Sequence, residues 1–164
     1  MRKVVSNTTP LISLLKIGHL HLLESLFSKV IVPQAVWQEI EQGREWSYYT
    51  DLQTLPFISI QSVGNPDAVE YLTDLDRGEA EVIVLAREVG ADLVIIDEEI
   101  GRSYARHFGL ALTGTLGILL KAKQNGLIPE VRPLLEVLVS KGVWIDRHLL
   151  DHVLTLAGEK IDKP

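Results

Sequence analysis

Residues 90–97 read Gly-Ala-Asp-Leu-Val-Ile-Ile-Asp, and this stretch decides the fold class. Its apolar run, Leu93–Ile96, follows a glycine turn and leads directly into the carboxylate of Asp97. Short, uninterrupted, β-branched runs are typical of strands that are buried on both faces, as in a parallel sheet covered by helices. The stretch therefore predicts a buried strand that ends in an acid.

Similar runs recur along the chain, with helical patterns between them. Lys3–Ser6, Lys29–Val32 and Leu110–Thr113 are predicted strands, Phe57–Ile60 is a short extended piece, and Val143–Asp146 is the last predicted strand. Helices are expected from Pro10 to about Gly18 and at Leu20–Phe27, Gln34–Gln42, Asp67–Thr73, Glu79–Val89, Glu98–Phe108, Thr115–Asn125, Glu130–Ser140 and Arg147–Gly158. This alternation predicts an α/β fold built on a parallel sheet.

The length and composition fit one globular domain, residues 1–164. With 46% hydrophobic and 23% charged residues, the chain is not intrinsically disordered. The absence of cysteine excludes disulfides, zinc–thiolate sites and thiol nucleophiles. The apolar run near the N-terminus is too short for a signal peptide, and no apolar stretch is long enough to cross a membrane. We therefore expect a cytoplasmic protein that does not bind a membrane.

The formal net charge is −6, from 22 acidic residues against 16 lysines and arginines. A protein that holds nucleic acid by charge alone is normally basic. The acidic excess has two interpretations: it keeps the protein soluble, or it gathers carboxylates that hold a divalent cation and so reverse the local field. The positions of the acids along the chain must decide between them.

Polar side chains occur where the predicted strands end. Asn7 follows the first strand and Asp97 follows the strand described above, while Glu39 and Glu79 lie on helices that begin near the same edge. Glu79 heads the apolar stripe of its helix, and Glu81, two positions later, points elsewhere. Ligands of open α/β sheets bind beyond the carboxyl ends of the strands. We therefore expect these side chains to converge at one edge.

Each residue also has an ordinary structural explanation. Glu79 fits a capping box, Asp97 fits a helix N-cap, and Asn7 fits a turn. Glu39 fits a solvated helix position, and the pair Glu98–Glu99 fits surface charges that complement a helix dipole. Taken one at a time, the signals are weak, and only their convergence at one edge favours a site.

Metal-assisted hydrolysis is the chemistry that uses such a group of oxygens. Mg²⁺ and Mn²⁺ prefer carboxylate and water oxygens, and a bound cation attracts a phosphodiester and activates water. A phosphate-binding glycine loop is absent, and His148 and His152 lack a third partner for a zinc site. A receiver-like or nucleotide-binding protein is disfavoured, because the last predicted strand ends at Asp146 and not at a lysine.

Four motifs in order resemble those of PIN-domain proteins. They are Val5–Ile12 with the turn Asn-Thr-Thr-Pro, Val32–Ile40 with Glu39, Gly78–Glu81 followed by Ala86, and Gly90–Asp97. The order and spacing agree over nearly the whole chain. The stretches Asp97–Arg102 and Gly114–Gly117 are further similar to a prokaryotic PIN branch related to the VapC-type toxins of toxin–antitoxin pairs.

The resemblance implies a three-layer α/β/α sandwich around a short-stranded parallel sheet, and Mg²⁺- or Mn²⁺-dependent cleavage of RNA. Glu39, Glu79 and Asp97 match the acidic catalytic and metal-binding positions, with Glu81 as the alternate for Glu79. It also implies a homodimer and a small antitoxin protein as a partner.

One position departs from the family pattern, because the first acidic position is Asn7. Its amide oxygen can ligate a metal but brings no negative charge. From the resemblance as a whole, the chain is predicted to be a metal-dependent ribonuclease. Asn7 would then be a fourth metal ligand, and Arg102 would position the RNA. The alternative is a catalytically weak or inactive module that binds RNA or protein.

Overall fold

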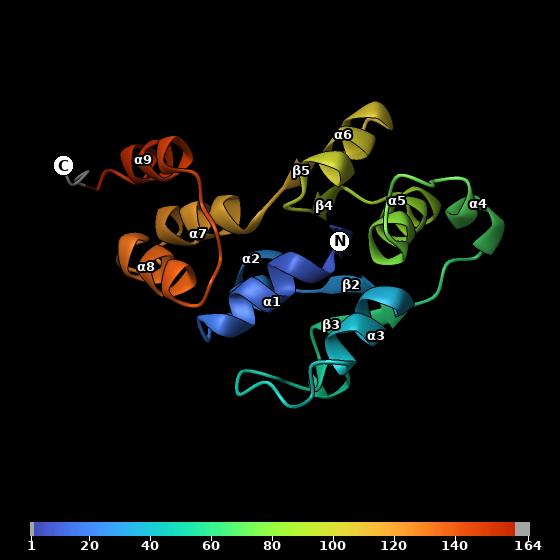
Figure 1. The fold of residues 1–164 in the computed structure, drawn as a ribbon, viewed down its shortest axis with the longest axis horizontal. Helices are drawn as coiled ribbons and strands as arrows, with labels where there is room; N and C mark the ends of the chain where they lie inside the picture. The colour runs from blue at the N-terminus through green and yellow to red at the C-terminus, as the bar shows by residue number, and fades with distance from the viewer. Residues whose placement is uncertain (1, 160–164) are drawn as a thin grey trace.

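The computed structural model describes residues 2–159 and contains a five-stranded parallel sheet (Figure 1). The strands are β1 (Val4–Ser6), β2 (Val30–Pro33), β3 (Ile58–Gln61), β4 (Leu93–Ile95) and β5 (Leu112–Thr113), in the order β3-β2-β1-β4-β5. Ser6 pairs with Ile95 at the end of β1 and β4, and Val5 pairs with Ile31 of β2. The predicted α/β class with a parallel sheet is confirmed.

Helices cover both faces of the sheet and give the predicted three-layer α/β/α sandwich. They are α1 (Thr8–Lys16), α2 (Leu22–Phe27), α3 (Gln34–Glu41), α4 (Pro66–Glu70), α5 (Arg77–Val89), α6 (Glu99–His107), α7 (Thr115–Gln124), α8 (Arg132–Ser140) and α9 (Arg147–Leu156), with a 3₁₀ turn at Leu52–Thr54. Helix α5 packs on β1 and β2 with α6 beside it, and α2 and α7 pack together on the opposite face. Helices α8 and α9 form an outer group next to α7 (Figure 1).

The strand order reverses at β1. The chain first moves from β1 to β2 and β3, and then returns past β1 to β4 and β5. Right-handed connections place the helices of the two halves on opposite faces, so their loops separate at the carboxyl ends of β1 and β4. This switch point is the place where an open α/β sheet binds its ligands.

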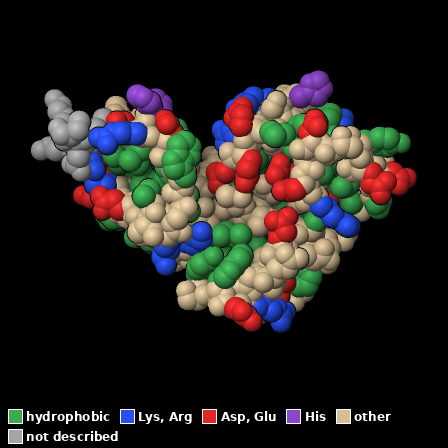
Figure 2. All heavy atoms as spheres, viewed as in Figure 1, with side chains coloured by type: hydrophobic (Ala, Val, Ile, Leu, Met, Phe, Trp, Pro, Cys, Tyr) green, Lys and Arg blue, Asp and Glu red, His purple; other side chains and the backbone are tan. Residues whose placement is uncertain are grey.

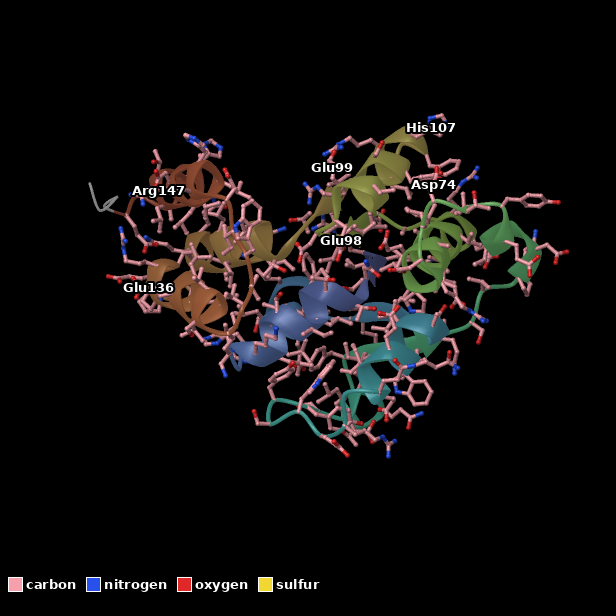
Figure 3. All side chains as sticks on the ribbon, viewed as in Figure 1. Asp74, Glu98, Glu99, His107, Glu136 and Arg147 are labelled. Carbon is pink, nitrogen blue, oxygen red and sulfur yellow. The ribbon has the colours of Figure 1, made fainter. Side chains whose placement is uncertain are left out.

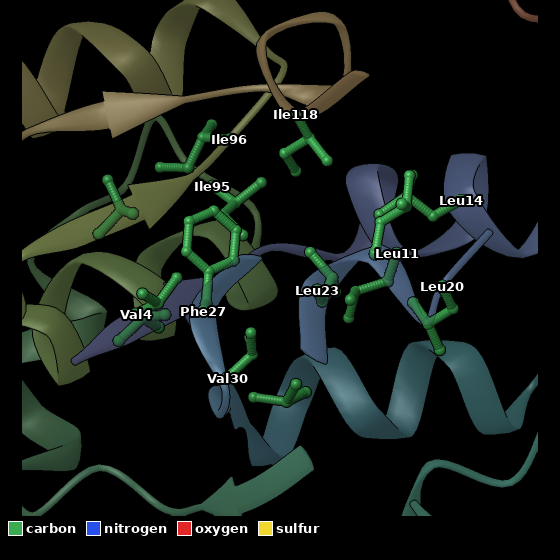
Figure 4. Packing of buried hydrophobic residues seen from close by; sticks show 14 of the residues in the cluster. Val4, Leu11, Leu14, Leu20, Leu23, Phe27, Val30, Ile95, Ile96 and Ile118 are labelled. Carbon is green, nitrogen blue, oxygen red and sulfur yellow. The ribbon is translucent and has the colours of Figure 1, made fainter. Parts of the chain in front are cut away.

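The core fills the space between the sheet and the two helical layers. Val4, Val30 and Ile95 of the strands and Ile96, directly after β4, are fully buried. The residues that pack with them in Figure 4 include Leu11, Leu14, Leu20, Leu23, Phe27 and Ile118. Because β1 and β4 are buried on both faces, their short apolar sequences are the strongest fold signals in the chain.

Two expectations about strands need correction. The segment Val143–Asp146 is not a strand: it connects α8 to α9, Trp144 is 84% exposed, and the Asp146 carboxylate caps α9 by accepting from the backbone N–H groups of His148 and Leu149. The extended piece Phe57–Ile60, shifted by one residue, is a full member of the sheet and forms its edge strand β3.

Within residues 2–159, no helix combines the length and apolar character needed to cross a lipid bilayer.

Candidate functional site

Helix N-termini gather at the carboxyl edge of the sheet. Helices α1, α3 and α7 each begin directly after a strand, and α6 begins a few residues after β4. Helix α5 also begins near this edge, because its first residues lie against a side chain of α3. Each N-terminus carries unpaired N–H groups and a partial positive charge that favours anionic side chains. The edge can therefore hold several carboxylates at lower cost than an apolar surface could.

Glu39 of α3 lies over the first turn of α5. A Cβ atom at Gly78 would come within 2.5 Å of Glu39 Oε1, so a larger residue there would displace this carboxylate. In the same turn, Asp76 caps α5 by accepting a hydrogen bond of 2.8 Å from the backbone N–H of Glu79. Three acidic side chains from two helices thus meet at one place.

Glu98 joins this group from the loop after β4. Its Oε2 accepts a hydrogen bond of 3.3 Å from Asn7 Nδ2, and its Oε1 accepts one from the hydroxyl of Thr9. Figure 3 shows Glu98 in the middle of the edge, between α1 and α6, whereas Glu99 lies on the outer side of α6. We call Glu39, Asp76, Glu79 and Glu98 the acidic cluster. Figure 2 shows acidic side chains gathered near the centre of the face that it presents.

Two members of the acidic cluster, Glu39 and Glu79, have pKa values that are raised by burial and by the charges of neighbouring acids. Burial raises the pKa of the Glu79 carboxyl to about 8, and the hydrogen bond and charge of Asp76 contribute to the rise, followed by the charges of Glu98 and Glu39. Burial also raises the pKa of Glu39, together with the charges of Asp76 and Glu98. Such mutual repulsion shows that the carboxylates share one electrostatic site.

A buried hydroxyl points toward the same group. Thr8 is 5% exposed, and its Oγ1 has no hydrogen bond of ordinary geometry within the described part of the chain. It lies close enough to Glu39 to oppose part of the rise in that carboxyl's pKa. A buried hydroxyl without a full partner is costly, which indicates a position prepared for a further polar group.

Asp97 lies next to the acidic cluster but is held differently. Its Oδ1 accepts from the backbone N–H of Thr115 and its Oδ2 from the Thr115 hydroxyl, both at 2.7 Å. Burial raises the pKa of Asp97, these hydrogen bonds lower it, and the charge of Glu98 raises it. Arg102 donates to the carbonyl oxygen of Ile96 at 2.9 Å and stands beside this contact. Asp97 therefore fastens the beginning of α7 to the end of β4.

Glu81 has a structural contact away from the acidic cluster. It is 4% exposed, accepts a hydrogen bond of 3.0 Å from the backbone N–H of Ala35, and pairs with Arg77 at 3.3 Å. Glu81, on α5, thus provides a hydrogen-bond acceptor for a backbone N–H group in the first turn of α3. The geometry favours Glu79 over its alternate Glu81 as the residue that faces the cluster.

The structure brings Asn7, Glu39 and Glu79 together and places Asp97 beside them. The prediction that Glu98 is a surface charge is wrong, because Glu98 contacts Asn7 and Thr9 at the centre of the edge. Its neighbour Glu99 is exposed and pairs with Arg106, as expected of a surface charge. The sequence signal for Glu98 was its place directly after a strand-terminal acid.

The donors at this edge suit a hard divalent cation, although they do not yet enclose one. Across residues 2–159, no three aspartate, glutamate or histidine side chains already stand as a metal-binding group. The available ligands are carboxylate, amide and hydroxyl oxygens, the types that Mg²⁺ and Mn²⁺ prefer. The raised pKa values of Glu39 and Glu79 and the Thr8 hydroxyl without an ordinary hydrogen bond are further features that fit such a cation.

The chain is an α/β/α sandwich with acidic side chains at the switch point of its sheet. A family model for the PIN domain matches residues 3–159, and the chain therefore belongs to the PIN-domain family. Members of this family generally use divalent metal ions. A search among curated proteins gave no match to the sequence.

Proposed function

We propose that the protein is a metal-dependent endoribonuclease that hydrolyses phosphodiester bonds at the acidic edge. The carrying observation is that Glu39 and Glu79 both have pKa values raised by burial and by neighbouring acids at the switch point of a PIN domain. A cation is the most direct way to stabilise carboxylates in such a setting.

The residues that would hold Mg²⁺ or Mn²⁺ are Asn7, Glu39, Glu79 and Asp97. When bound, the ion supplies a Lewis acid for the phosphodiester and lowers the pKa of water. Glu79, which holds a proton up to a pH of about 8 in the absence of a cation, can accept or deliver a proton at the edge. Arg102 stands beside Asp97 and is suited to contact a phosphate.

A cavity between α4 and α5 offers room for part of a nucleic-acid substrate. It has a volume of about 470 Å³ and is lined by Arg77 and Glu81 of α5, and no side chain of the acidic cluster lines it. Its walls combine apolar side chains such as Leu72 and Leu75 with the polar groups of Gln34 and Thr73. A flat base packs against apolar walls and hydrogen-bonds at its edges, so one nucleotide of an RNA strand fits this chemistry.

The experiment that tests the proposal measures cleavage of single-stranded RNA by the purified protein with Mg²⁺ or Mn²⁺ and with excess EDTA. We expect cleavage only with the metal, and a loss of about 100-fold or more in Glu79→Gln, since proton transfer alone contributes about 10²–10⁴-fold. The matched control is Glu136→Gln, an exposed position on α8 far from the edge (Figure 3). Equal cleavage in EDTA would exclude the metal role.

The runner-up function is a PIN-type module that binds RNA or protein without cleaving, because Asn7 brings no charge. If the native protein binds RNA but does not cleave it, and Asn7→Asp creates metal-dependent cleavage, the silent module is the correct interpretation.

A homodimer and a small inhibitory antitoxin, both implied by the resemblance, are part of the main proposal if the protein is a toxin. Analytical ultracentrifugation of the purified protein tests the dimer.

A further inference from the structure

Asn7 and Glu98 form a pair across the two central strands. Ser6 and Ile95 are register partners at the ends of β1 and β4, so the residues that follow them emerge side by side. Asn7 is 3% exposed and occupies the N-cap position of α1, and Glu98 occupies that of α6. Neither side chain caps its own helix, although capping is the usual role of a polar residue there. Both are turned toward each other instead.

The charge of Glu98 fixes the orientation of the Asn7 amide. An ionised carboxylate only accepts hydrogen bonds, so the NH₂ group of Asn7 must face Glu98, as the Nδ2 to Oε2 distance of 3.3 Å shows. The amide oxygen, Oδ1, is then directed away from the Glu98 carboxylate. Glu98 thereby presents Asn7 as an oxygen ligand.

The hydroxyl of Thr9 completes the arrangement. It donates to the second oxygen of Glu98, so both carboxylate oxygens are positioned from the first turn of α1. The buried hydroxyl of Thr8 lies on the neighbouring residue and faces Glu39, but it has no hydrogen bond of ordinary geometry within residues 2–159. A buried hydroxyl in this state is a second observation beside the charges of the acids, and it indicates that the space between α1 and α3 is prepared for a polar ligand.

We propose that Glu98 supplies the negative charge that Asn7 lacks, so that the Asn7–Glu98 pair together acts as the first acidic position of a divalent-cation site. The inference rests on the proposed function, because it concerns the same cation. It adds Glu98 to the metal-binding residues and makes Asn7 a neutral ligand that Glu98 orients.

The neighbouring Glu99 provides a matched control. It is one position along the chain and has the same charge, but its side chain is exposed and pairs with Arg106 at 2.9 Å. A long-range effect of net charge would act similarly from both positions, whereas a role at the cation site belongs to Glu98 alone.

The test measures Mn²⁺ binding by isothermal titration calorimetry and by the electron paramagnetic resonance signal of free Mn²⁺, without RNA. We expect Glu98→Gln to weaken Mn²⁺ binding about 10- to 100-fold, the range found when a residue supporting a metal ligand is lost. Glu99→Gln should bind as the native protein does. The double variant N7D/E98Q exchanges amide and carboxylate while keeping a hydrogen bond possible, and it should recover most of the lost affinity.

The inference is overturned if Glu98→Gln binds Mn²⁺ like the native protein, or if N7D/E98Q binds no better than Glu98→Gln. If Glu98→Gln does not fold, as judged by circular dichroism, N7D/E98Q is compared directly with the native protein: similar binding supports the pair, and loss of binding contradicts it. RNA cleavage is measured on the same samples. If the native protein needs Mn²⁺ to cleave RNA and Glu98→Gln binds Mn²⁺ as the native protein does, the proposed function stands and only the role of Glu98 is rejected. If the native protein binds no Mn²⁺, both proposals are rejected.

Discussion

In the acidic cluster the carboxylates of Glu39 and Glu79 face other carboxylates, whereas at the beginning of α7 the carboxylate of Asp97 faces the two donors of Thr115. Burial raises the pKa of all three groups, yet only Asp97 has two short hydrogen bonds that oppose the rise. The difference teaches that acids at one sheet edge divide between two roles. In the acidic cluster the carboxylates repel one another, whereas Asp97, which we also propose as a cation ligand, joins strand to helix as well.

The largest expected effect that separates the two regions is stabilisation by metal. At a Mn²⁺ concentration of 100 times its dissociation constant, the free energy of unfolding should rise by about 2.7 kcal/mol. Glu79→Gln should remove most of this increase, while Thr115→Val, which leaves every carboxylate in place, should retain most of it. Urea unfolding with and without Mn²⁺ measures the change. An equal increase in Glu79→Gln would mean that the cation binds elsewhere.

The next effect concerns the contact between Asp97 and Thr115. Asp97→Asn should lower the free energy of unfolding in metal-free buffer by about 1–3 kcal/mol, because a charged acceptor is lost from two buried donors. Thr115→Val should lower it by a similar or smaller amount. The double variant should cost less than the sum of the two, since both changes remove one interaction. Strictly additive values from urea unfolding would contradict this role.

A further expected effect is a pH dependence that belongs to the acidic cluster. The pKa of Glu79 is raised from its ordinary value of 4.5 to about 8, so between these values the folded protein keeps a proton that the unfolded chain releases. The stability from this group is therefore complete below a pH of about 4.5 and is lost as the pH rises toward 8. In EDTA, the unfolding free energy of the native protein should fall over this range more than that of Glu79→Gln. Parallel curves for the two proteins would show that Glu79 is not the titrating group.

Local sequence predicted the central elements well. The strand ending at Asp97 and the helix capped by Asp76 both follow from patterns within ten residues, because burial on both faces and capping leave clear signals. The same reasoning failed at Val143–Asp146, whose β-branched and aromatic residues read as a strand. That segment has no place beside β5, because α7 and α8 carry the chain away from the sheet before it.

The candidate site was only partly accessible to the same reasoning. Glu39 and Glu79 could be proposed because each lies on a helix that was predicted to begin near the carboxyl edge of the sheet. Glu98 could not be distinguished from Glu99, since adjacent acids at a helix start have the same local pattern. Their opposite environments depend on the first turn of α1, which lies about ninety positions away in the chain and contacts only Glu98.

The sequence by itself determined the layered α/β architecture, the family, and the edge at which polar groups collect. Hydrophobic periodicity and helix caps involve residues close in the chain, so each segment's own sequence predicts its secondary structure. The tertiary structure alone decided which acids face one another, which one is tied to Thr115, and which one accepts the amide of Asn7. The Asn7–Glu98 contact depends on the parallel pairing of β1 with β4, the Asp97–Thr115 contact on that of β4 with β5, and the proximity of Glu39 and Glu79 on the packing of α3 against α5.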